Sequence, residues 1–251
     1  MFGANELTED GFLGGRLRIS QPRDGYRAAM DPVLLAAAVP ARAGDTVLEL
    51  GCGAGVASLC LASRVPGLAL TGLELQSGYA ALARANATAN QIMFTVEEGD
   101  LEAMPLSLRA QSFDHVIANP PYYPLGGGTR ATDKGREMAL REALPLANWI
   151  DAGLKRLKPG GWLTFIQAAD RLGDLLSALP AKAGSTVVLP LTSRQGKDAN
   201  RVIMRARKGA RGAFRLAAPV ILHDGEAHCA DGDDYSAIAR SVLRDGEALF
   251  F

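Results

Sequence analysis

The hydrophobic positions fall into short runs whose spacing alternates along the chain between that of strands and that of helices. Apolar runs that end in Gly or a polar residue are typical of buried strands, and runs with a three-to-four-residue repeat are typical of helices. The predicted strands are Thr46–Leu50, Leu68–Leu73, Met93–Glu97, Phe113–Ala118 and Trp162–Gln167, and the predicted helices are Pro32–Val39, Gly55–Ser63, Ser77–Asn90 and Leu144–Leu157. This alternation predicts βαβ units and a parallel sheet with helices on both faces.

The C-terminal part follows a different pattern. The helix before Trp162 is expected to stop at Pro159-Gly160-Gly161. Further on, the apolar runs Thr186–Leu191 and Arg201–Arg207 are joined by a short polar loop, which predicts an antiparallel hairpin. The predicted fold is therefore α/β, a doubly wound sheet of seven strands that is mostly parallel and ends in an antiparallel hairpin. We expect one domain over residues 1–251, with 1–40 as an N-terminal extension and lid and 41–251 as the core.

Composition narrows the class of protein. The chain has 251 residues, of which 48% are hydrophobic and 22% charged, so it can bury a full core and is not intrinsically disordered. Asp31 and Glu49 interrupt the two most apolar stretches, and Met1–Asp10 is polar and acidic, so we expect neither a membrane-spanning helix nor a cleavable signal. Three cysteines without metal-ligand spacing fit a reducing cytoplasm, where we expect the protein to reside.

A glycine-rich turn follows the first strand of the predicted core. Gly51, Gly53 and Gly55 have the spacing Gly-x-Gly-x-Gly, and Val56 stands where a dinucleotide fingerprint has its third Gly. A pyrophosphate site is therefore less well supported than close approach of the backbone to a compact ligand. Alone, the turn could simply be a tight strand–helix packing turn.

Two carboxylates follow the next strands in the order that a nucleoside site requires. Glu74 lies nineteen residues after Gly55, where a carboxylate can accept hydrogen bonds from ribose hydroxyls. Asp100 follows the third strand, where it can accept a proton of an adenine amino group. Because the carboxyl ends of parallel strands form the ligand crevice, the ordered set favours a nucleoside cofactor.

The fourth predicted strand ends in Asn119-Pro120-Pro121-Tyr122. Two prolines restrict the backbone, which suits a site that must hold a group in one position. The Asn119 amide oxygen and the Pro120 carbonyl can accept hydrogen bonds from one amino group, and Tyr122 can stack on a planar group. The alternative is an Asn-Pro turn with Tyr122 as a packing residue, and the upstream turn and carboxylates favour the catalytic interpretation.

These motifs resemble those of class I S-adenosylmethionine-dependent methyltransferases of the Asn-Pro-Pro-Tyr type, which methylate amino groups. Within that type the chain is most similar to the bacterial tRNA adenine-N6 methyltransferase family that acts beside the anticodon of a valine tRNA. Four segments carry the resemblance, which extends from about Tyr26 to the C-terminus: Met30–Leu35, Glu49–Gly55, Asn119–Tyr122 and Arg194–Met204.

The resemblance implies a Rossmann-like fold, S-adenosylmethionine as the cofactor and RNA as the substrate, tRNA by preference. It implies that Gly51, Gly53, Glu74 and Asp100 hold the cofactor, that Asn119 holds the target amino group, and that Tyr122 holds the base. Around these we assign Asp31, Glu49, Cys52, Gly55, Leu75, Leu101 and Asn119 to the cofactor site, and Asn119, Pro120, Pro121 and Tyr122 to the catalytic set.

The net charge of zero conceals a basic segment. Between Arg194 and Arg215 there are eight basic residues and one acid, whereas Leu216–Phe251 carries seven acids against two arginines. By itself such a segment is typical of a solvated surface strand. If the sixth strand runs parallel to the others, however, the loop after it lies beside Asn119, where Arg194 and Lys197 could contact a phosphate backbone. We assign Arg130, Lys134, Arg194, Lys197 and Arg201 to RNA binding and expect Arg201, Arg205 and Arg207 to share one face of their strand.

Two smaller features have competing interpretations. Asp31-Pro32 is a good helix start, so Asp31 could be an N-cap, or the segment with Tyr26 and Arg27 could cover the methionine end of the cofactor. His115 lies inside a predicted strand and is expected to be structural rather than a base. No His or Cys has partners at metal-ligand spacing, so no metal is expected.

The sequence thus predicts N6-methylation of adenine in RNA. Methylation of a glutamine amide in a translation factor is the first alternative, although only about forty residues precede the first strand, too few for the helical substrate-binding domain of such enzymes. A non-catalytic RNA-binding module is the second, and the Asn119–Tyr122 motif argues against it because a binding module needs no amino clamp. The oligomeric state stays open.

Overall fold

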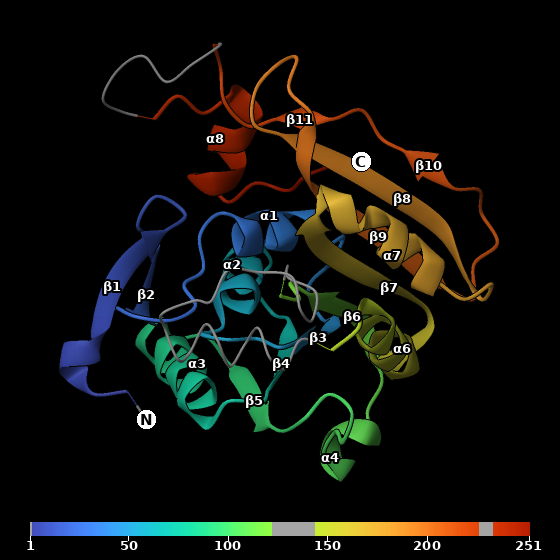
Figure 1. Ribbon diagram of the computed structural model, residues 1–251. Coiled ribbons are helices and arrows are strands. Elements are labelled where there is room, and N and C mark those ends of the chain that lie inside the picture. Colours follow the sequence, from blue (N-terminus) through green and yellow to red (C-terminus); the bar gives the residue numbers. More distant parts are fainter. Residues whose placement is uncertain (1, 122–143, 226–232) are drawn as a thin grey trace.

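The computed structural model describes residues 2–121, 144–225 and 233–251. Its main sheet has the order β10-β8-β9-β7-β6-β3-β4-β5, with β11 also paired to β8 (Figure 1). The strands are β3 (Thr46–Leu50), β4 (Ala69–Glu74), β5 (Phe94–Glu98), β6 (Phe113–Ala118), β7 (Leu157–Ala168), β8 (Ala183–Thr192), β9 (Ala199–Lys208), β10 (Arg215–Leu216) and β11 (Val220–Ile221). Across the sheet, the neighbouring strands in the order β7-β6-β3-β4-β5 pair in parallel. Strand β9 is antiparallel to both β7 and β8. The α/β fold with its antiparallel hairpin is therefore confirmed.

The strand count differs from the prediction, because the sheet has nine strands rather than seven. The two extra strands, β10 and β11, are two residues long and pair in parallel with the outer side of β8. Segments this short carry no hydrophobic periodicity, so their pairing with β8 cannot be read from the sequence.

The start of β7 also differs from the prediction. The preceding helix ends at Arg156 and β7 begins at Leu157, so Pro159-Gly160-Gly161 lies inside the strand. There the register with β6 shifts between Phe113 and His115. Gly160 has a φ of +78°, and a Cβ atom at Gly161 would lie 2.9 Å from the Asp114 carbonyl. The two glycines therefore form an irregularity within the strand instead of ending the helix.

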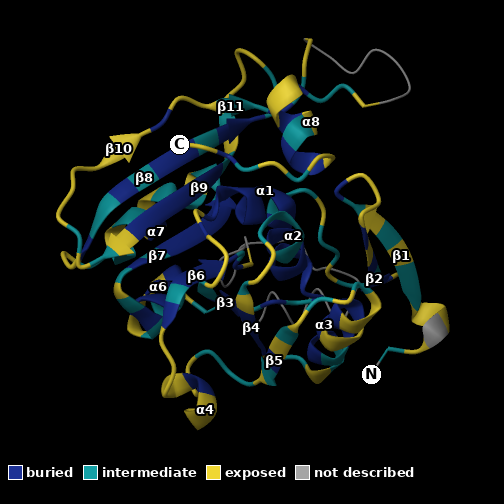
Figure 2. Ribbon diagram, turned by 180° about the vertical axis from the view of Figure 1, so that it is seen from behind, coloured by how far each residue is buried: buried dark blue, intermediate teal, exposed yellow. Residues whose placement is uncertain are grey.

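Helices cover both faces of the sheet (Figure 1). They are α1 (Asp31–Ala38), α2 (Val56–Arg64), α3 (Ser77–Ala89), α4 (Leu106–Arg109), α6 (Leu146–Arg156), α7 (Leu172–Ala178) and α8 (Ala237–Leu243). Residues of α1, α2, α3 and α8 share one hydrophobic cluster, and those of α4, α6 and α7 share the cluster on the other face. The central strands are buried between these layers, whereas β10 and α4 are largely exposed (Figure 2). No described helix is long and apolar enough to cross a bilayer.

The N-terminal extension contains a two-stranded antiparallel sheet, formed by β1 (Leu7–Phe12) and β2 (Leu17–Pro22) after a short 3-10 turn (Ala4–Glu6). Asn86 of α3 fixes this hairpin, because its amide accepts from Ser20 N at 2.8 Å and donates to the Ser20 carbonyl at 3.0 Å. Helix α1 then begins at Asp31, with Met30 as its N-cap and no side-chain cap. The interpretation of Asp31 as an N-cap is therefore wrong.

Candidate active site

The carboxyl ends of the four central strands meet at one edge of the sheet. Leu50, the last residue of β3, lies opposite Leu73 of β4 and opposite Ala118 of β6. Gly51 and Asn119, which follow β3 and β6, therefore leave the sheet side by side, and Glu74 ends the adjacent strand. The structure thus brings the glycine turn, the first carboxylate and the Asn-Pro-Pro segment to one place, as strand order requires.

The glycine turn has a backbone that other residues rarely adopt. Gly51, Gly53 and Gly55 have φ angles of +66°, +52° and +87°. A Cβ atom at Gly51 would lie 2.8 Å from the Trp149 ring, so this glycine also allows α6 to pack against the turn. Trp149 was missed by the sequence analysis, because nothing in its helix indicates a contact with residue 51.

Glu74 is bound to the turn. Glu74 is 6% exposed, and its carboxylate accepts hydrogen bonds from Gly53 N at 2.8 Å and from Gln76 N at 2.9 Å. Burial raises the pKa of Glu74, while the backbone hydrogen bonds of Gln76 and Gly53 oppose this rise. Because each carboxylate oxygen can accept a second donor, Glu74 can still bind hydroxyl groups of a ligand.

Three other predicted cofactor residues, Leu75, Asp100 and Leu101, follow the ends of β4 and β5. Gly99 N donates to the Glu74 carbonyl at 2.9 Å and so joins the end of β5 to that of β4. The next residue, Asp100, accepts a hydrogen bond from Glu102 N at 2.8 Å, which orients its carboxylate. Leu75 is 48% exposed beside Glu74, whereas Leu101 is half-buried against the α6 side. The chemistry of this set, glycine backbone, carboxylates and apolar side chains, fits a nucleoside.

Cys52 and Cys60 have structural positions. Cys52 is 4% exposed, and a Cβ atom at Gly72 of β4 would lie 2.7 Å from its sulfur. The Cys52 side chain therefore packs on β4, which leaves only its backbone to face a ligand at the turn. Cys60 is 2% exposed in α2 and belongs to the core, as predicted.

Glu49 lies deeper than the other carboxylates. It is 4% exposed, and one carboxylate oxygen accepts from Ser58 N at 3.0 Å and from Ser58 Oγ at 2.5 Å. Burial raises the pKa of Glu49 to about 8, although the hydrogen bonds from Ser58 oppose this rise. These contacts hold the start of α2 against β3 and so fix the glycine turn between them.

Tyr26 lies between the glycine turn and Asn119. A pocket of about 40 Å³ is lined by residues of both segments, among them Tyr26, Gly53 and Asn119. Asn119 Nδ2 donates to the Tyr26 hydroxyl at 3.2 Å. Burial of this hydroxyl, with the negative charges of Asp31 and Glu49, raises the pKa of Tyr26. The glycine turn at Gly51 and Gly53 and the residue Asn119 thus line one pocket.

The segment after β6 is fixed by a residue that the sequence analysis missed. Pro120 is buried, Pro121 is exposed, and Gln167 Nε2 donates to the Pro120 carbonyl at 3.4 Å. Gln167 is fully buried near the end of β7, the neighbour of β6. A polar residue near the end of an otherwise apolar strand is the signal that could have identified it. Tyr122, Arg130 and Lys134 lie outside the described residues.

The basic residues of the hairpin have acidic partners near this edge. Since β9 is antiparallel to both β7 and β8, β8 runs parallel to β7, and its following loop lies at the edge of Asn119, as predicted. Arg194 forms an ion pair with Asp234, and Arg201 Nε lies 3.1 Å from Asp31 Oδ2. The exposed Lys197 forms no ion pair with a described residue.

The expected basic face of β9 is not open. Arg205 is 8% exposed, because it donates to the Ala38 carbonyl at 3.3 Å and its guanidinium lies 3.7 Å from the Phe251 ring centroid. The last residues of the chain therefore cover the middle of the face that Arg201, Arg205 and Arg207 share. Arg205 shares this face but is covered, so it does not belong to a basic surface that is open to RNA.

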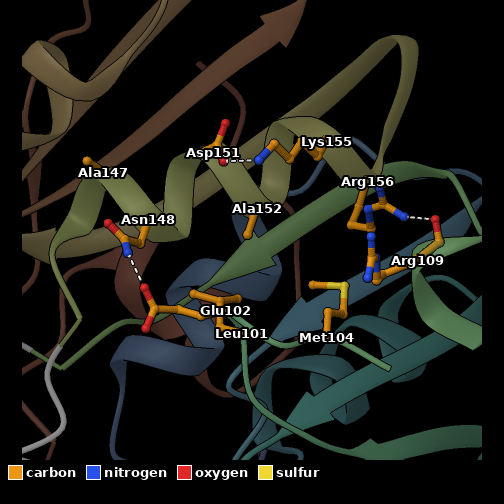
Figure 3. A pocket seen from close by; sticks show the side chains of 10 residues that line it. All are labelled: Leu101, Glu102, Met104, Arg109, Ala147, Asn148, Asp151, Ala152, Lys155 and Arg156. Carbon is orange, nitrogen blue, oxygen red and sulfur yellow. Dashed lines mark hydrogen bonds and ion pairs between the residues drawn. The ribbon is translucent and has the colours of Figure 1, made fainter. Parts of the chain in front are cut away.

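A second, larger pocket of about 740 Å³ lies beside the candidate site, between α6 and the segment around α4 (Figure 3). Asn148 Nδ2 donates to Glu102 Oε1 at 2.6 Å across it, and Lys155 forms an ion pair with Asp151 at 2.6 Å. Of the predicted site residues, only Leu101 lines it. It is therefore separate from the pocket that holds Asn119.

Titratable groups elsewhere have structural partners. His115 Nε2 lies 3.0 Å from Asp45 Oδ2 in the interior of β6, and burial lowers its pKa despite this neighbour. His223 Nδ1 lies 2.7 Å from Asp234 Oδ1. Among the described residues no group of three or more His, Cys, Asp or Glu side chains could hold a metal ion.

Comparison with known proteins agrees with this geometry. The family model of the methyltransferase small domain matches residues 30–171, more than half of the chain. A tRNA1(Val) (adenine(37)-N6)-methyltransferase from Porphyromonas gingivalis is 30% identical over 211 residues, which cover 80% of this chain and 82% of the relative. The enzyme of the same name from Aeromonas hydrophila subsp. hydrophila is 28% identical, with coverage of 79% and 84%.

The fold also matches that of solved structures. A crystal structure from Agrobacterium tumefaciens, described as a predicted O-methyltransferase, superposes with a TM-score of 0.70 and 24% identity. The match covers 88% of this chain and 98% of that one. At this level of identity the likeness concerns the fold alone.

Proposed function

Because the chain belongs to the methyltransferase small domain family and is an S-adenosylmethionine-dependent methyltransferase, we propose that it methylates N6 of adenine in RNA, tRNA by preference. The names of its relatives support tRNA as the substrate. The observation that carries the proposal is that Asn119 and the glycine turn line the same pocket. A target amino group held by Asn119 therefore lies next to the methyl donor bound at the glycine turn.

The cofactor site consists of the residues that the strand ends present. Glu74 and Asp100 bind the hydroxyl and amino groups of the nucleoside part, and the backbone at Gly51 and Gly53 approaches it closely. Leu75 and Leu101 contact its apolar faces. Once bound, S-adenosylmethionine supplies an electrophilic methyl group on a sulfonium.

The catalytic contribution of the chain is positioning. The Asn119 amide oxygen and the Pro120 carbonyl accept the two hydrogens of the target amino group, which draws the nitrogen lone pair out of conjugation and aims it at the methyl carbon. The two prolines and Gln167 fix the second acceptor, since Gln167 Nε2 lies 3.4 Å from it. Tyr122 stacks on the base after it leaves its helical stack. The amino proton is released after transfer, so no general base is required beforehand.

The segment from Tyr26 to Asp31 covers the methionine end of the cofactor site. It crosses the pocket at Tyr26 and is attached to β9 by the Asp31–Arg201 ion pair. Arg194, Lys197 and Arg201 then lie where RNA phosphates pass the catalytic edge. Arg130 and Lys134, which follow Tyr122 in the chain, complete this RNA-binding set.

A methyl-transfer assay with labelled S-adenosylmethionine tests the proposal. Unmodified tRNA, ribosomal RNA and a glutamine-bearing translation factor are offered in parallel, and nucleosides are identified by mass spectrometry. The expected product is N6-methyladenosine in tRNA. Label in the protein would indicate glutamine methylation, and RNA binding without transfer would indicate a non-catalytic module, so either result contradicts the proposal.

The variant Asn119→Ala tests the amino clamp. We expect loss of transfer with at most a small loss of cofactor affinity, because Asn119 holds the target amino group and only borders the cofactor, whose other contacts remain. Asn200→Ala is the matched control, since Asn200 is exposed at the same edge of the sheet and has no assigned role. Near-normal transfer by Asn119→Ala would contradict the mechanism.

A further inference from the structure

Among the residues that the structure describes, positive charge without acidic partners gathers at the end of the sheet opposite Asn119. Between Leu175 and His223 the chain has nine basic residues and a single acid, Asp198, which lies in the β8–β9 loop at the catalytic edge. At that edge Arg194 and Arg201 each have a carboxylate partner, Asp234 and Asp31. At the other end lies a group that we call the basic edge: Lys182, Arg207, Lys208, Arg211, Phe214 and Arg215.

Backbone hydrogen bonds hold the basic edge together. Gly209 N donates to the Lys182 carbonyl at 2.7 Å, and Ser185 N donates to the Gly212 carbonyl at 3.0 Å, so the start of β8 and the segment after β9 are adjacent. Strand β10 then places Arg215 opposite Val187 of β8. The basic edge is therefore one continuous surface along the outer side of the sheet, where Figure 2 shows β10 exposed.

The cations of the basic edge contact backbone or solvent rather than carboxylates. Arg207 Nε donates to the Gly160 carbonyl at 2.8 Å, and Lys208 Nζ donates to the Leu157 carbonyl at 2.6 Å. None of the five cations of the basic edge forms an ion pair with a residue in the described ranges. Burial, followed by repulsion from Lys182 and Arg156, lowers the pKa of Lys208. Such crowding of like charges is relieved when a polyanion binds.

The exposed side chains between these cations are large and apolar. Phe214 is 53% exposed and stands between Arg211 and Arg215, and Leu216 of β10 is 61% exposed. Charges alone would be typical of an edge strand that is protected against pairing with other chains. An exposed aromatic side chain and an exposed Leu do not protect an edge strand in this way, because apolar side chains favour pairing with other chains. A ring between arginines is instead typical of sites where an unpaired base stacks and its phosphates bind cations.

We propose that the basic edge is a second docking surface for RNA, which binds the phosphate backbone and stacks one unpaired base on Phe214. The inference rests on the proposed RNA substrate. Arg201, near Asn119, and Lys208 are seven residues apart on β9, which corresponds to about 23 Å at about 3.3 Å per residue. An RNA that places a base at Asn119 can therefore contact the basic edge with a part more than 20 Å away.

Binding of an unmodified tRNA transcript at several salt concentrations tests the inference. The variant Arg211→Gln/Arg215→Gln is compared with Arg18→Gln/Arg23→Gln, which removes the same charge from the N-terminal hairpin on the other side of the molecule (Figure 1). Removal of two phosphate contacts is expected to weaken binding and to reduce the slope of log K against log salt by about 1.4 to 1.8. The control variant is expected to keep the wild-type slope.

Phe214→Ala tests the stacking part of the surface. Loss of one base–aromatic contact is expected to weaken tRNA binding by about fivefold or more, with the salt slope unchanged because no charge is removed. The variants Arg211→Gln/Arg215→Gln and Phe214→Ala are both expected to raise KM for tRNA and to leave kcat unchanged, because the basic edge lies far from the reacting atoms.

The outcomes separate this inference from the proposed function. If the Arg211 and Arg215 variant binds tRNA with wild-type affinity and salt slope, the basic edge is not an RNA surface, even when tRNA is methylated. If it loses binding to vesicles with anionic lipids and keeps RNA binding, the surface belongs to a membrane and the inference is wrong. If tRNA binds through this edge without being methylated, the inference stands and the proposed activity fails.

Discussion

Asn119 Nδ2 and the Tyr26 hydroxyl lie 3.2 Å apart, although 93 residues separate them in the chain. The backbone around Tyr26 is held from two sides. Tyr79 Oη donates to the Tyr26 carbonyl at 3.0 Å, and Gln21 binds both backbone groups of Ala28, at 2.8 and 3.2 Å. The N-terminal hairpin and α3 thus determine where the Tyr26 ring stands, and through it how the Asn119 amide is oriented.

The variant Tyr26→Phe is therefore expected to lower kcat. It keeps the ring over the pocket and removes the hydroxyl that accepts from Asn119, a loss of about 1 kcal/mol or about fivefold in rate. KM for S-adenosylmethionine is expected to change little, because the ring and its packing remain. Steady-state kinetics with tRNA measures both constants.

Tyr235→Phe is the control for this substitution, since Tyr235 stacks near His223 at 5.2 Å and has no assigned catalytic role. A rise in KM for the cofactor with kcat preserved would show that Tyr26 binds the cofactor rather than orienting Asn119.

A second prediction concerns Glu74, whose two oxygens accept from Gly53 N and Gln76 N. In Glu74→Gln one carboxylate oxygen is replaced by an amide NH2 group. Either Gly53 N or Gln76 N then loses its acceptor, at a cost of about 1–3 kcal/mol. We expect affinity for S-adenosylhomocysteine, measured by calorimetry, to fall by about tenfold or more.

Glu98→Gln is the matched control for Glu74→Gln. Glu98 lies directly opposite Glu74 in β5 and is exposed. If both variants bind the cofactor product as the wild type does, Glu74 does not belong to the cofactor site.

A third prediction concerns the pH dependence of stability. Burial raises the pKa of Glu49 from 4.5 to about 8, so the unfolded chain releases this proton at a lower pH than the folded chain. The contribution of the Glu49 proton to the stability of the folded state is therefore fully present below pH 4.5, and it is lost as the pH rises towards 8. Between pH 6 and pH 8 the loss is about 2 kcal/mol.

Glu49→Gln is expected to abolish that part of the pH dependence. Both hydrogen bonds from Ser58 reach the same Glu49 oxygen, so a glutamine oxygen can accept them as well. Urea unfolding of the wild type and the variant without cofactor, at pH 6 and pH 8, gives the two differences in free energy. Equal differences would mean that Glu49 is ionised in the folded protein at pH 6.

The fold was largely predictable because its central strands are continuous apolar runs between Gly and polar residues. The positions of Glu74, Asp100 and Asn119 were predictable for a related reason, since each lies at or just after the carboxyl end of a strand whose place in the order could be inferred. β10 and β11 were not predictable, because two residues carry no pattern. The strand start at Leu157 was missed because Pro159-Gly160-Gly161 has the composition of a turn and here forms an irregularity inside a strand.

Contacts between distant segments account for the missed part of the site. Arg201 lies 170 residues from Asp31, and neither residue shows in the sequence that the other neutralises it. The same holds for Trp149 beside Gly51 and for Gln167 beside Pro120. Such pairs depend on how helices and strands are placed, and hydrophobic periodicity describes each element only by itself.

The fourth prediction concerns the contact between Gly51 and Trp149. Gly51→Ala adds a Cβ atom at a φ of +66°, only 2.8 Å from the Trp149 ring, so backbone strain and overpacking act together. Strain at a left-handed position costs about 1 kcal/mol and overpacking about 1–3 kcal/mol more. Gly44→Ala separates the two, because Gly44 has a φ of +91° with nothing within 4 Å of the added atom.

Urea unfolding is therefore expected to show a larger loss of stability for Gly51→Ala than for Gly44→Ala. The double variant Gly51→Ala/Trp149→Leu is expected to recover part of the overpacking cost, since a smaller side chain leaves room for the methyl group. A positive coupling between the two positions in the double-mutant cycle would show that the ring is the obstacle. Strictly additive losses would mean that the turn fails from backbone strain alone, and that α6 does not limit the space at the cofactor turn.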